Sequence, residues 1–151
     1  MNVKSLCRMD VSTVRASDEL SAAAQQMRDA HVGYLVVAEP LPLGGWSKPI
    51  GVLTDRDIVI EVLAKGVDAR SVTVGDIMTR EPVVVGEDQS LSFALKAMRK
   101  IGARRIPVVG AAGHLVGILT MDDVVSSLAK ELYEVSSAVR HEIDVEKALR
   151  P

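Results

Sequence analysis

The apolar positions of this chain change their spacing in the same order twice. Each time, a short β-branched stretch precedes an amphipathic helical segment, two apolar runs and a second helical segment. The predicted strands are 11–14, 34–37 and 50–53 in the first copy and 83–85, 106–109 and 115–119 in the second; the predicted helices are 20–30, 57–65, 91–101 and 123–133. Each copy is therefore predicted to be a strand, helix, strand, strand, helix unit of the α/β (α+β) class.

The two copies align residue by residue. Leu20 corresponds to Leu91 at an offset of 71 residues, and the offset falls to 66 at Gly51 and Gly117. The first copy therefore contains five more residues than the second. They lie in segment 40–49, whose prolines and glycines predict an irregular surface loop.

Neither copy can cover its own sheet, because two helices leave part of one face exposed. We expect the first repeat (1–70) and the second repeat (71–133) to pack about a pseudo-two-fold axis. The charged segment 134–151 is compatible with a helix. Two interpretations of it remain open, a helix that faces a partner and a solvated, fraying end.

Composition narrows the class of protein. Of the 151 residues, 48% are hydrophobic and 25% are charged, as in a globular protein. A net charge of −2 and an aromatic content of 3% disfavour nucleic-acid binding. No apolar run reaches the roughly 18 residues of a spanning helix, and the amino terminus resembles no export signal. We expect a cytoplasmic protein that does not enter the membrane.

The residues of common catalytic and metal sites are absent or scattered. His31, His114 and His141 have no ligand spacing, so no metal site is predicted. The single cysteine, Cys7, has no partner base, and neither a P-loop nor a Gly-x-Gly-x-x-Gly motif occurs. We therefore expect no enzyme activity and no required cofactor.

One motif occurs in both copies. Gly51-Val52-Leu53-Thr54-Asp55-Arg56-Asp57 corresponds to Gly117-Ile118-Leu119-Thr120-Met121-Asp122-Asp123, at the point where an apolar run meets a predicted helix. The first turn of a helix attracts anions, and an aspartate can accept hydrogen bonds from two neighbouring hydroxyls. Thr-x-x-Asp is also close to a helix capping box. On the residues alone, ligand binding and capping both remain open.

These motifs, together with Asp76-Ile77-Met78-Thr79 and Arg104-Arg105-Ile106-Pro107-Val108-Val109, resemble a tandem cystathionine-β-synthase (CBS) domain pair, or Bateman module, of the small stand-alone bacterial type. The resemblance covers about residues 3–131. It implies a non-catalytic regulatory module that binds adenine nucleotides (AMP, ADP, ATP or the related NAD) between the repeats. It also implies a homodimer, and a regulated protein partner that the sequence does not identify.

The resemblance also implies residue roles. Asp57 and Asp123 would bind ribose, and Thr54 and Thr120 would approach the phosphates. Thr79, Val83 and Pro107 would contact adenine in the second site, with Arg8 and Val11 as their counterparts in the first.

The resemblance also implies a phosphate-binding cation, which the two sites do not supply equally. Arg105 matches a phosphate-contacting position, whereas its counterpart Tyr34 carries no positive charge. The second site is therefore expected to hold phosphate better, unless Arg56 compensates in the first. Arg104 and Arg105 could equally be a solvated pair.

A second function remains open beside nucleotide sensing. A ligand-free structural or protein-interaction homodimer would use the two Thr-x-x-Asp turns only as helix caps. The sequence does not decide whether Trp46 anchors its loop or contacts a partner.

Overall fold

A computed structural model describes residues 1–42 and 44–150. The first repeat contains β1 (Thr13–Val14), α1 (Leu20–Ala30), β2 (Tyr34–Pro40), β3 (Ser47–Thr54), α2 (Asp55–Ile58) and the π-helix η1 (Val59–Leu63). The second contains α3 (Val74–Ile77), β4 (Thr79–Arg80), β5 (Val85–Gly86), α4 (Leu91–Ile101), β6 (Arg105–Val109), β7 (Leu115–Thr120) and α5 (Met121–Leu149). The predicted mixed α/β class and the order of elements are confirmed.

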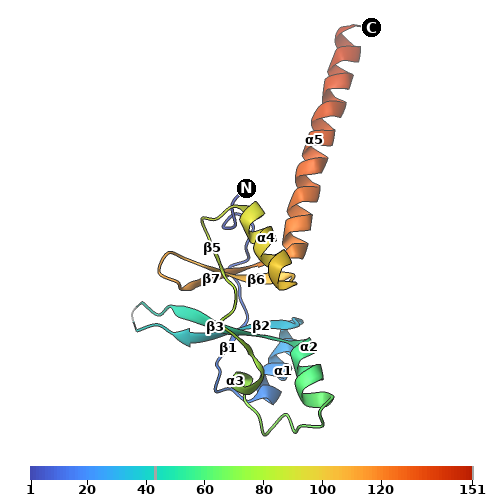
Figure 1. Ribbon diagram of the computed structural model, residues 1–151. Helices are drawn as coiled ribbons and strands as arrows, with labels where there is room; N and C mark the ends of the chain where they lie inside the picture. The colour runs from blue at the N-terminus through green and yellow to red at the C-terminus, as the bar shows by residue number, and fades with distance from the viewer. Residues whose placement is uncertain (43, 151) are drawn as a thin grey trace.

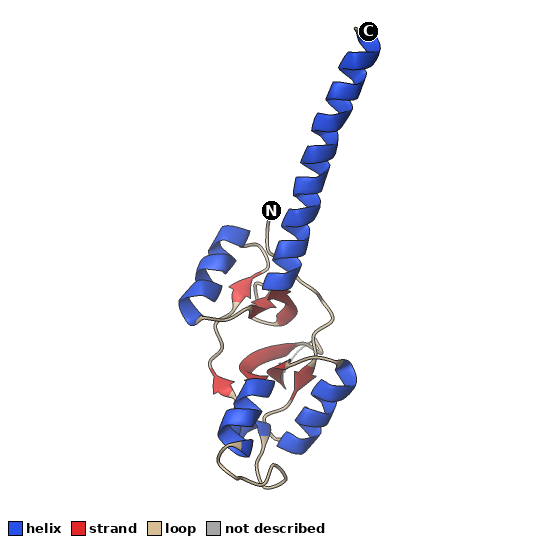
Figure 2. Ribbon diagram, turned by 90° about the vertical axis from the view of Figure 1, so that its right-hand side faces the viewer, coloured by secondary structure: helices blue, strands red, loops and turns tan. Residues whose placement is uncertain are grey.

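The two sheets have the same internal order. In the first sheet β1 runs parallel to β2, which pairs with β3 in antiparallel register. The second sheet repeats this with β5, β6 and β7, and each hairpin carries a register shift at the same place, after Val37 and after Val108. Figure 1 shows the hairpins β2–β3 and β6–β7 facing each other across the middle of the molecule. Figure 2 shows the helices at the two outer ends of this pair of sheets.

Each repeat pairs with the sheet of the other, through the strand β4 in the first sheet and through an isolated bridge in the second. The first lead segment (residues 1–12) reaches the second repeat, where Arg8 pairs with Ile118 of β7. The second lead segment (residues 72–83) reaches the first repeat, where Thr79 in β4 pairs with Val52 of β3. Because the exchange is reciprocal, the repeats are related by an approximate two-fold operation.

The cores follow the same exchange. Val3 is fully buried in the core of the second repeat, against Val85, Ile106 and Leu119. Val74 and Met78 are buried in the core of the first repeat. Each core therefore contains residues of the lead segment that precedes the other repeat.

The predicted irregular loop 40–49 is shorter than expected. β2 and β3 continue into it, so that Ala38 pairs with Pro49 and Pro40 pairs with Ser47. Pro49 is accommodated because it lies next to the register shift after Val37, where the ladder is already interrupted. Leu43, also in that segment, lies outside the described residues.

The last helix is much longer than predicted. It was expected to end at residue 133, but α5 continues to Leu149 without a glycine or proline to stop it. Figure 1 shows its distal half projecting away from both sheets. Pro151 at the end of the charged tail lies outside the described residues. None of the described helices is long and apolar enough to cross a membrane.

The motif glycines are required by the crossing of the lead segments. A Cβ atom added to Gly117 would lie 2.6 Å from the carbonyl oxygen of Arg8, and one added to Gly51 would lie 2.5 Å from Sδ of Met78. The first neighbour is backbone, which is fixed by strand pairing, whereas the second is a flexible side chain.

We therefore expect Gly117→Ala to lower the free energy of unfolding by about 1–3 kcal/mol, as overpacking does, and Gly51→Ala to cost less. Urea denaturation of the two variants measures the difference. A Gly117→Ala protein as stable as the parent would contradict the close crossing of residues 8 and 117.

Candidate ligand-binding clefts

Two of the clefts between the repeats contain the threonine of a Thr-x-x-Asp motif. The first, the Thr54 cleft, has a volume of about 260 Å³. Its lining comes from both repeats: Tyr34, Val52, Thr54, Thr79, Glu81, Pro82, Val83, Ile101, Ala103, Arg105 and Pro107. Apolar side chains predominate, so this cleft can enclose a flat, weakly polar group.

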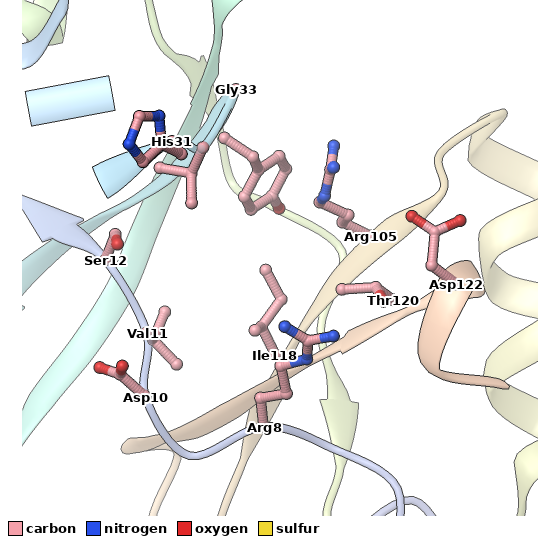
Figure 3. Close-up of a pocket in the computed structure, with 12 residues that line it drawn as sticks. Arg8, Asp10, Val11, Ser12, His31, Gly33, Arg105, Ile118, Thr120 and Asp122 are labelled. Carbon is pink, nitrogen blue, oxygen red and sulfur yellow. The ribbon is translucent and has the colours of Figure 1, made fainter. Parts of the chain in front are cut away.

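The second, the Thr120 cleft, has a volume of about 250 Å³ and a more charged lining. It is formed by Arg8, Asp10, Val11, Ser12, His31, Val32, Gly33, Tyr34, Arg105, Ile118, Thr120 and Asp122. Figure 3 shows Arg8, Asp10, Val11 and Ser12 following one another along the first lead segment, opposite Arg105 and Asp122. Both arginines and both aspartates therefore face the same space from different repeats.

The two clefts correspond to each other through the repeat. At the offset of 71, Arg8 corresponds to Thr79, and Asp10 corresponds to Glu81. Tyr34 and Arg105 correspond to each other, and both line both clefts. The Arg105 guanidinium lies 6.0 Å from the centre of the Tyr34 ring, within the range of a cation–π contact. This pair forms the shared wall between the clefts.

The helix start that borders the Thr54 cleft has a complete capping box. The amide of Asp57 donates to Oγ1 of Thr54 at 3.1 Å, and the amide of Thr54 donates to Oδ2 of Asp57 at 2.8 Å. The local turn is therefore built as the capping interpretation expects. Among the hydrogen bonds of the described residues, Oδ1 of Asp57 accepts none, so half of this carboxylate is available.

The helix start that borders the Thr120 cleft has a different set of hydrogen bonds. The amide of Asp123 donates to Oγ1 of Thr120 at 3.1 Å, and that hydroxyl donates to Oδ2 of Asp123 at 2.6 Å. Oδ1 of Asp123 accepts from Nε of Arg8 at 2.8 Å and from Nη2 of Arg8 at 2.5 Å. Both oxygens of this carboxylate are thus engaged.

The pKa of the Asp123 carboxyl follows from these contacts. Burial raises the pKa of the Asp123 carboxyl, but the hydrogen bonds from Arg8 and Thr120 and the positive charge of Arg8 outweigh burial, so the pKa lies below its usual value. Tyr34 behaves oppositely: burial raises its pKa, and nearby Arg105 only partly opposes the shift.

The structure brings most of the predicted site residues together, but each cleft combines the threonine of one repeat with residues that belong to the other. Thr79, Val83, Pro107 and Arg105 of the second repeat line the cleft of Thr54. Arg8 and Val11 line the cleft of Thr120, again with Arg105. Arg105 therefore faces both clefts, although it was expected to distinguish one from the other.

Three predicted residues do not line either cleft. Asp57 and Asp123 lie three residues beyond the lining threonines, in the same helix starts, and Arg56 is exposed outside the lining of both clefts. Sequence reasoning also missed the acidic pair Asp10 and Glu81, although the repeat offset aligns them and could have drawn attention to them.

The comparisons with known proteins agree with this architecture. The CBS domain family matches residues 3–64 and 74–130, so the chain belongs to the CBS domain family as a tandem pair. Hypoxic response protein 1 of Mycobacterium tuberculosis is 36% identical over 118 residues, which are 78% of each chain. The solved structure of CBSX2 in complex with AMP is 28% identical, with a TM-score of 0.70 over 85% of this chain and 96% of that one.

A further relative is longer than this chain. Protein MK0525 of Methanopyrus kandleri is 34% identical over 124 residues, which are 82% of this chain but 61% of the relative. The similarity to MK0525 therefore leaves more than a third of that protein unmatched.

Within residues 1–42 and 44–150, no group of three or more His, Cys, Asp or Glu side chains is arranged to hold a metal ion.

The ion pair of Arg8 with Asp123 gives a stability prediction. A carboxyl with a lowered pKa stabilises the fold above its unfolded pKa, and this contribution is lost as the pH falls through its folded pKa. Because Arg8 is largely exposed, we expect Arg8→Ala to cost only about 0.5 kcal/mol at pH 7 and nothing at a pH below both pKa values.

Denaturation as a function of pH measures this cost, and a double-mutant cycle isolates it. In an Asp123→Asn background, which keeps the size of the side chain, Arg8→Ala should have almost no effect. An equal cost in both backgrounds would mean that Arg8 stabilises the fold through other contacts.

Proposed function

We propose that this protein is a non-catalytic sensor of adenine mononucleotides, which it binds in the clefts between its repeats. The observation that carries the proposal is the pair of corresponding clefts, each of which joins a Thr-x-x-Asp helix start of one repeat to the lead segment that precedes the other. A ligand in either cleft would contact both repeats and so respond to their relative position.

The Thr54 cleft has separate groups that can bind the base, the ribose and the phosphate of a nucleotide. Val83, Pro107 and their apolar neighbours can sandwich a purine. Oδ1 of Asp57 can accept from a ribose hydroxyl without breaking the capping box, which uses only Oδ2. Thr54 and Arg105 can then bind phosphate at the helix start.

Cleft size favours a mononucleotide over NAD. Volumes of about 250 and 260 Å³ lie slightly below the usual range for small-molecule sites, roughly 300–1,000 Å³. The wall formed by Tyr34 and Arg105 separates the two clefts, so a dinucleotide would need that pair to move. The complex of the relative CBSX2 with AMP supports the same ligand class.

Nucleotide binding is tested by titration calorimetry with AMP, ATP and NAD on the parent and on an Asp57→Ala/Asp123→Ala variant. We expect the parent to bind AMP or ATP more tightly than NAD. Loss of the charge-assisted ribose contacts, each worth roughly 1.5–3 kcal/mol, should weaken binding at least tenfold.

The chain offers a matched control for this experiment. Thr73 and Asp76 form a capping box at the start of α3, outside the lining of both clefts. Asp76→Ala should lower the melting temperature like any lost cap and leave nucleotide affinity unchanged. If all carboxylate variants lose stability and the parent gains none from any adenine nucleotide, the turns act only as caps.

Helix α5 favours the alternative function, that of a structural or protein-interaction homodimer. Within the described part of this helix only Val124 is buried. Val125, Leu128, Leu132, Val135 and Val139 are all exposed and follow one another at spacings of three and four residues. We call these five residues the α5 seam. Such spacing is typical of a helix that packs along another helix, and a second copy supplies an identical one.

The α5 seam predicts a dimer that a single charge disrupts. Leu132, which is 70% exposed in the single chain, should tolerate Leu132→Glu without unfolding, while the variant becomes monomeric. Ser126→Glu adds the same charge on the opposite face of α5 and should leave the dimer intact. Light scattering after size exclusion measures both. A monomeric parent, or equal behaviour of the two variants, would contradict dimerisation through the seam.

A further inference from the structure

The two clefts differ at one decisive position. In the Thr120 cleft, Arg8 donates two hydrogen bonds to Oδ1 of Asp123. Its counterpart in the Thr54 cleft is Thr79, which is uncharged. The carboxylate of Asp57 therefore has a free oxygen, whereas that of Asp123 is held at both oxygens.

We propose that Arg8 makes the Thr120 cleft selective for phosphorylated ligands, because it leaves Asp123 only when a ligand phosphate replaces that carboxylate as its partner. This inference rests on the proposed nucleotide function. It adds to that function a residue, Arg8, which determines the ligands that the Thr120 cleft binds.

The geometry allows Arg8 to exchange partners. Its backbone is fixed by two hydrogen bonds to Ile118, each of 2.9 Å. Its side chain is 66% exposed, so the guanidinium can rotate without repacking the core. In Figure 3 the Arg8 guanidinium lies between Ile118 and Thr120, on the same side of the cleft as the start of α5, where an anion is favoured.

Charge balance then decides which ligands enter. A ribose that takes over Oδ1 of Asp123 leaves Arg8 without its carboxylate. An uncharged nucleoside offers no anionic group in return, and of the two other acids in the lining Asp122 already accepts from Nη2 of Arg104 at 2.8 Å. A phosphate accepts from Arg8 directly, and Arg105 provides a second cation in the same cleft.

The Thr54 cleft has no such requirement. A nucleoside can use the free Oδ1 of Asp57 while Thr54 keeps its capping box. The protein therefore has one cleft that accepts adenosine with or without phosphate and a second that discriminates against the bare nucleoside.

The experiment isolates the Thr120 cleft by filling the other one. Val83 lines the Thr54 cleft but not the Thr120 cleft, and it is 43% exposed, so Val83→Trp can block the former without overpacking the core. In this background, the affinities for adenosine and for ATP are measured by calorimetry with Arg8 present and with Arg8→Ala. Lys4→Ala removes a neighbouring cation that pairs with Glu87 and serves as the control.

With Arg8 present, we expect ATP to bind and adenosine to bind at least twentyfold more weakly. Arg8→Ala should strengthen adenosine binding only about twofold, because the ion pair it breaks is exposed, and weaken ATP binding about tenfold, so that the ratio of the two affinities falls about twentyfold. Lys4→Ala should leave the ratio unchanged. Arg8→Ala changing both affinities by the same factor, or neither, overturns the proposal.

A second measurement needs no nucleoside. The Asp123 carboxyl is followed by carbon NMR during pH titration, with and without inorganic tripolyphosphate. We expect tripolyphosphate to raise the pKa of Asp123, because Arg8 leaves the carboxylate. An unchanged Asp123 pKa at saturation, or no binding of either tripolyphosphate or ATP, overturns the role of Arg8.

The two failures are distinguishable. If adenosine and AMP stabilise the parent while tripolyphosphate leaves Asp123 unaffected, the sensor function stands and the Arg8 proposal fails. If tripolyphosphate shifts Asp123 while no adenine compound binds the parent, Arg8 selects phosphate and the adenine-sensor function fails.

Discussion

The structure depends on the reciprocal crossing of the two lead segments. Thr79 in β4 pairs with Val52, and Arg8 forms an isolated bridge with Ile118, so each sheet is joined by backbone pairing to the chain that precedes the other repeat. Val3 and Val74, both fully buried, anchor these crossings in opposite cores. The glycines of the repeated motif leave the room that the crossings need. Since every crossing joins both halves, backbone pairing as well as packing restrains the relative position of the repeats.

The same crossing creates the clefts. It carries the lead segment of one repeat past the helix start of the other, so the threonine of each turn faces residues from a distant part of the chain. Capping and ligand binding are therefore compatible uses of one turn. At Thr54 the box consumes one carboxylate oxygen and leaves the other, whereas at Thr120 an arginine from the lead segment takes the place that a ligand would need. The clefts share a wall and differ in their charged residues, since the Thr120 cleft has Arg8 where the Thr54 cleft has the uncharged Thr79 and is also lined by Asp122.

The order of the elements could be predicted from the sequence, but the contacts between the repeats could not, for a physical reason. The order of elements followed from apolar spacing, and helices 20–30 and 91–101 were predicted with the bounds they have. The repeat offset of 71 relates Cys7 to Met78, and the structure places them at corresponding crossings, against Gly117 and Gly51. However, alignment within the chain says which residues correspond and not which ones meet. Arg105 was thus assigned to one site although a two-fold arrangement places it against Tyr34 between both. The contact of Arg8 with Asp123 spans 115 residues of sequence and leaves no local pattern.

The helix starts connect the clefts to the surface of the protein. Thr120 caps α5, so the turn that faces the second cleft is also the first turn of a 29-residue helix about 43 Å long. Thr54 caps a much shorter segment, α2 followed by η1, and has no comparable extension. A ligand shifts an arrangement of the repeats only if it binds that arrangement more tightly than its alternatives. Any such shift at Thr120 would tilt α5 as a rigid arm, and its distal seam residues would move further than those near the cleft. If the proposed function holds, the second repeat is the half of the module from which ligand occupancy would be transmitted to a second copy packed along α5.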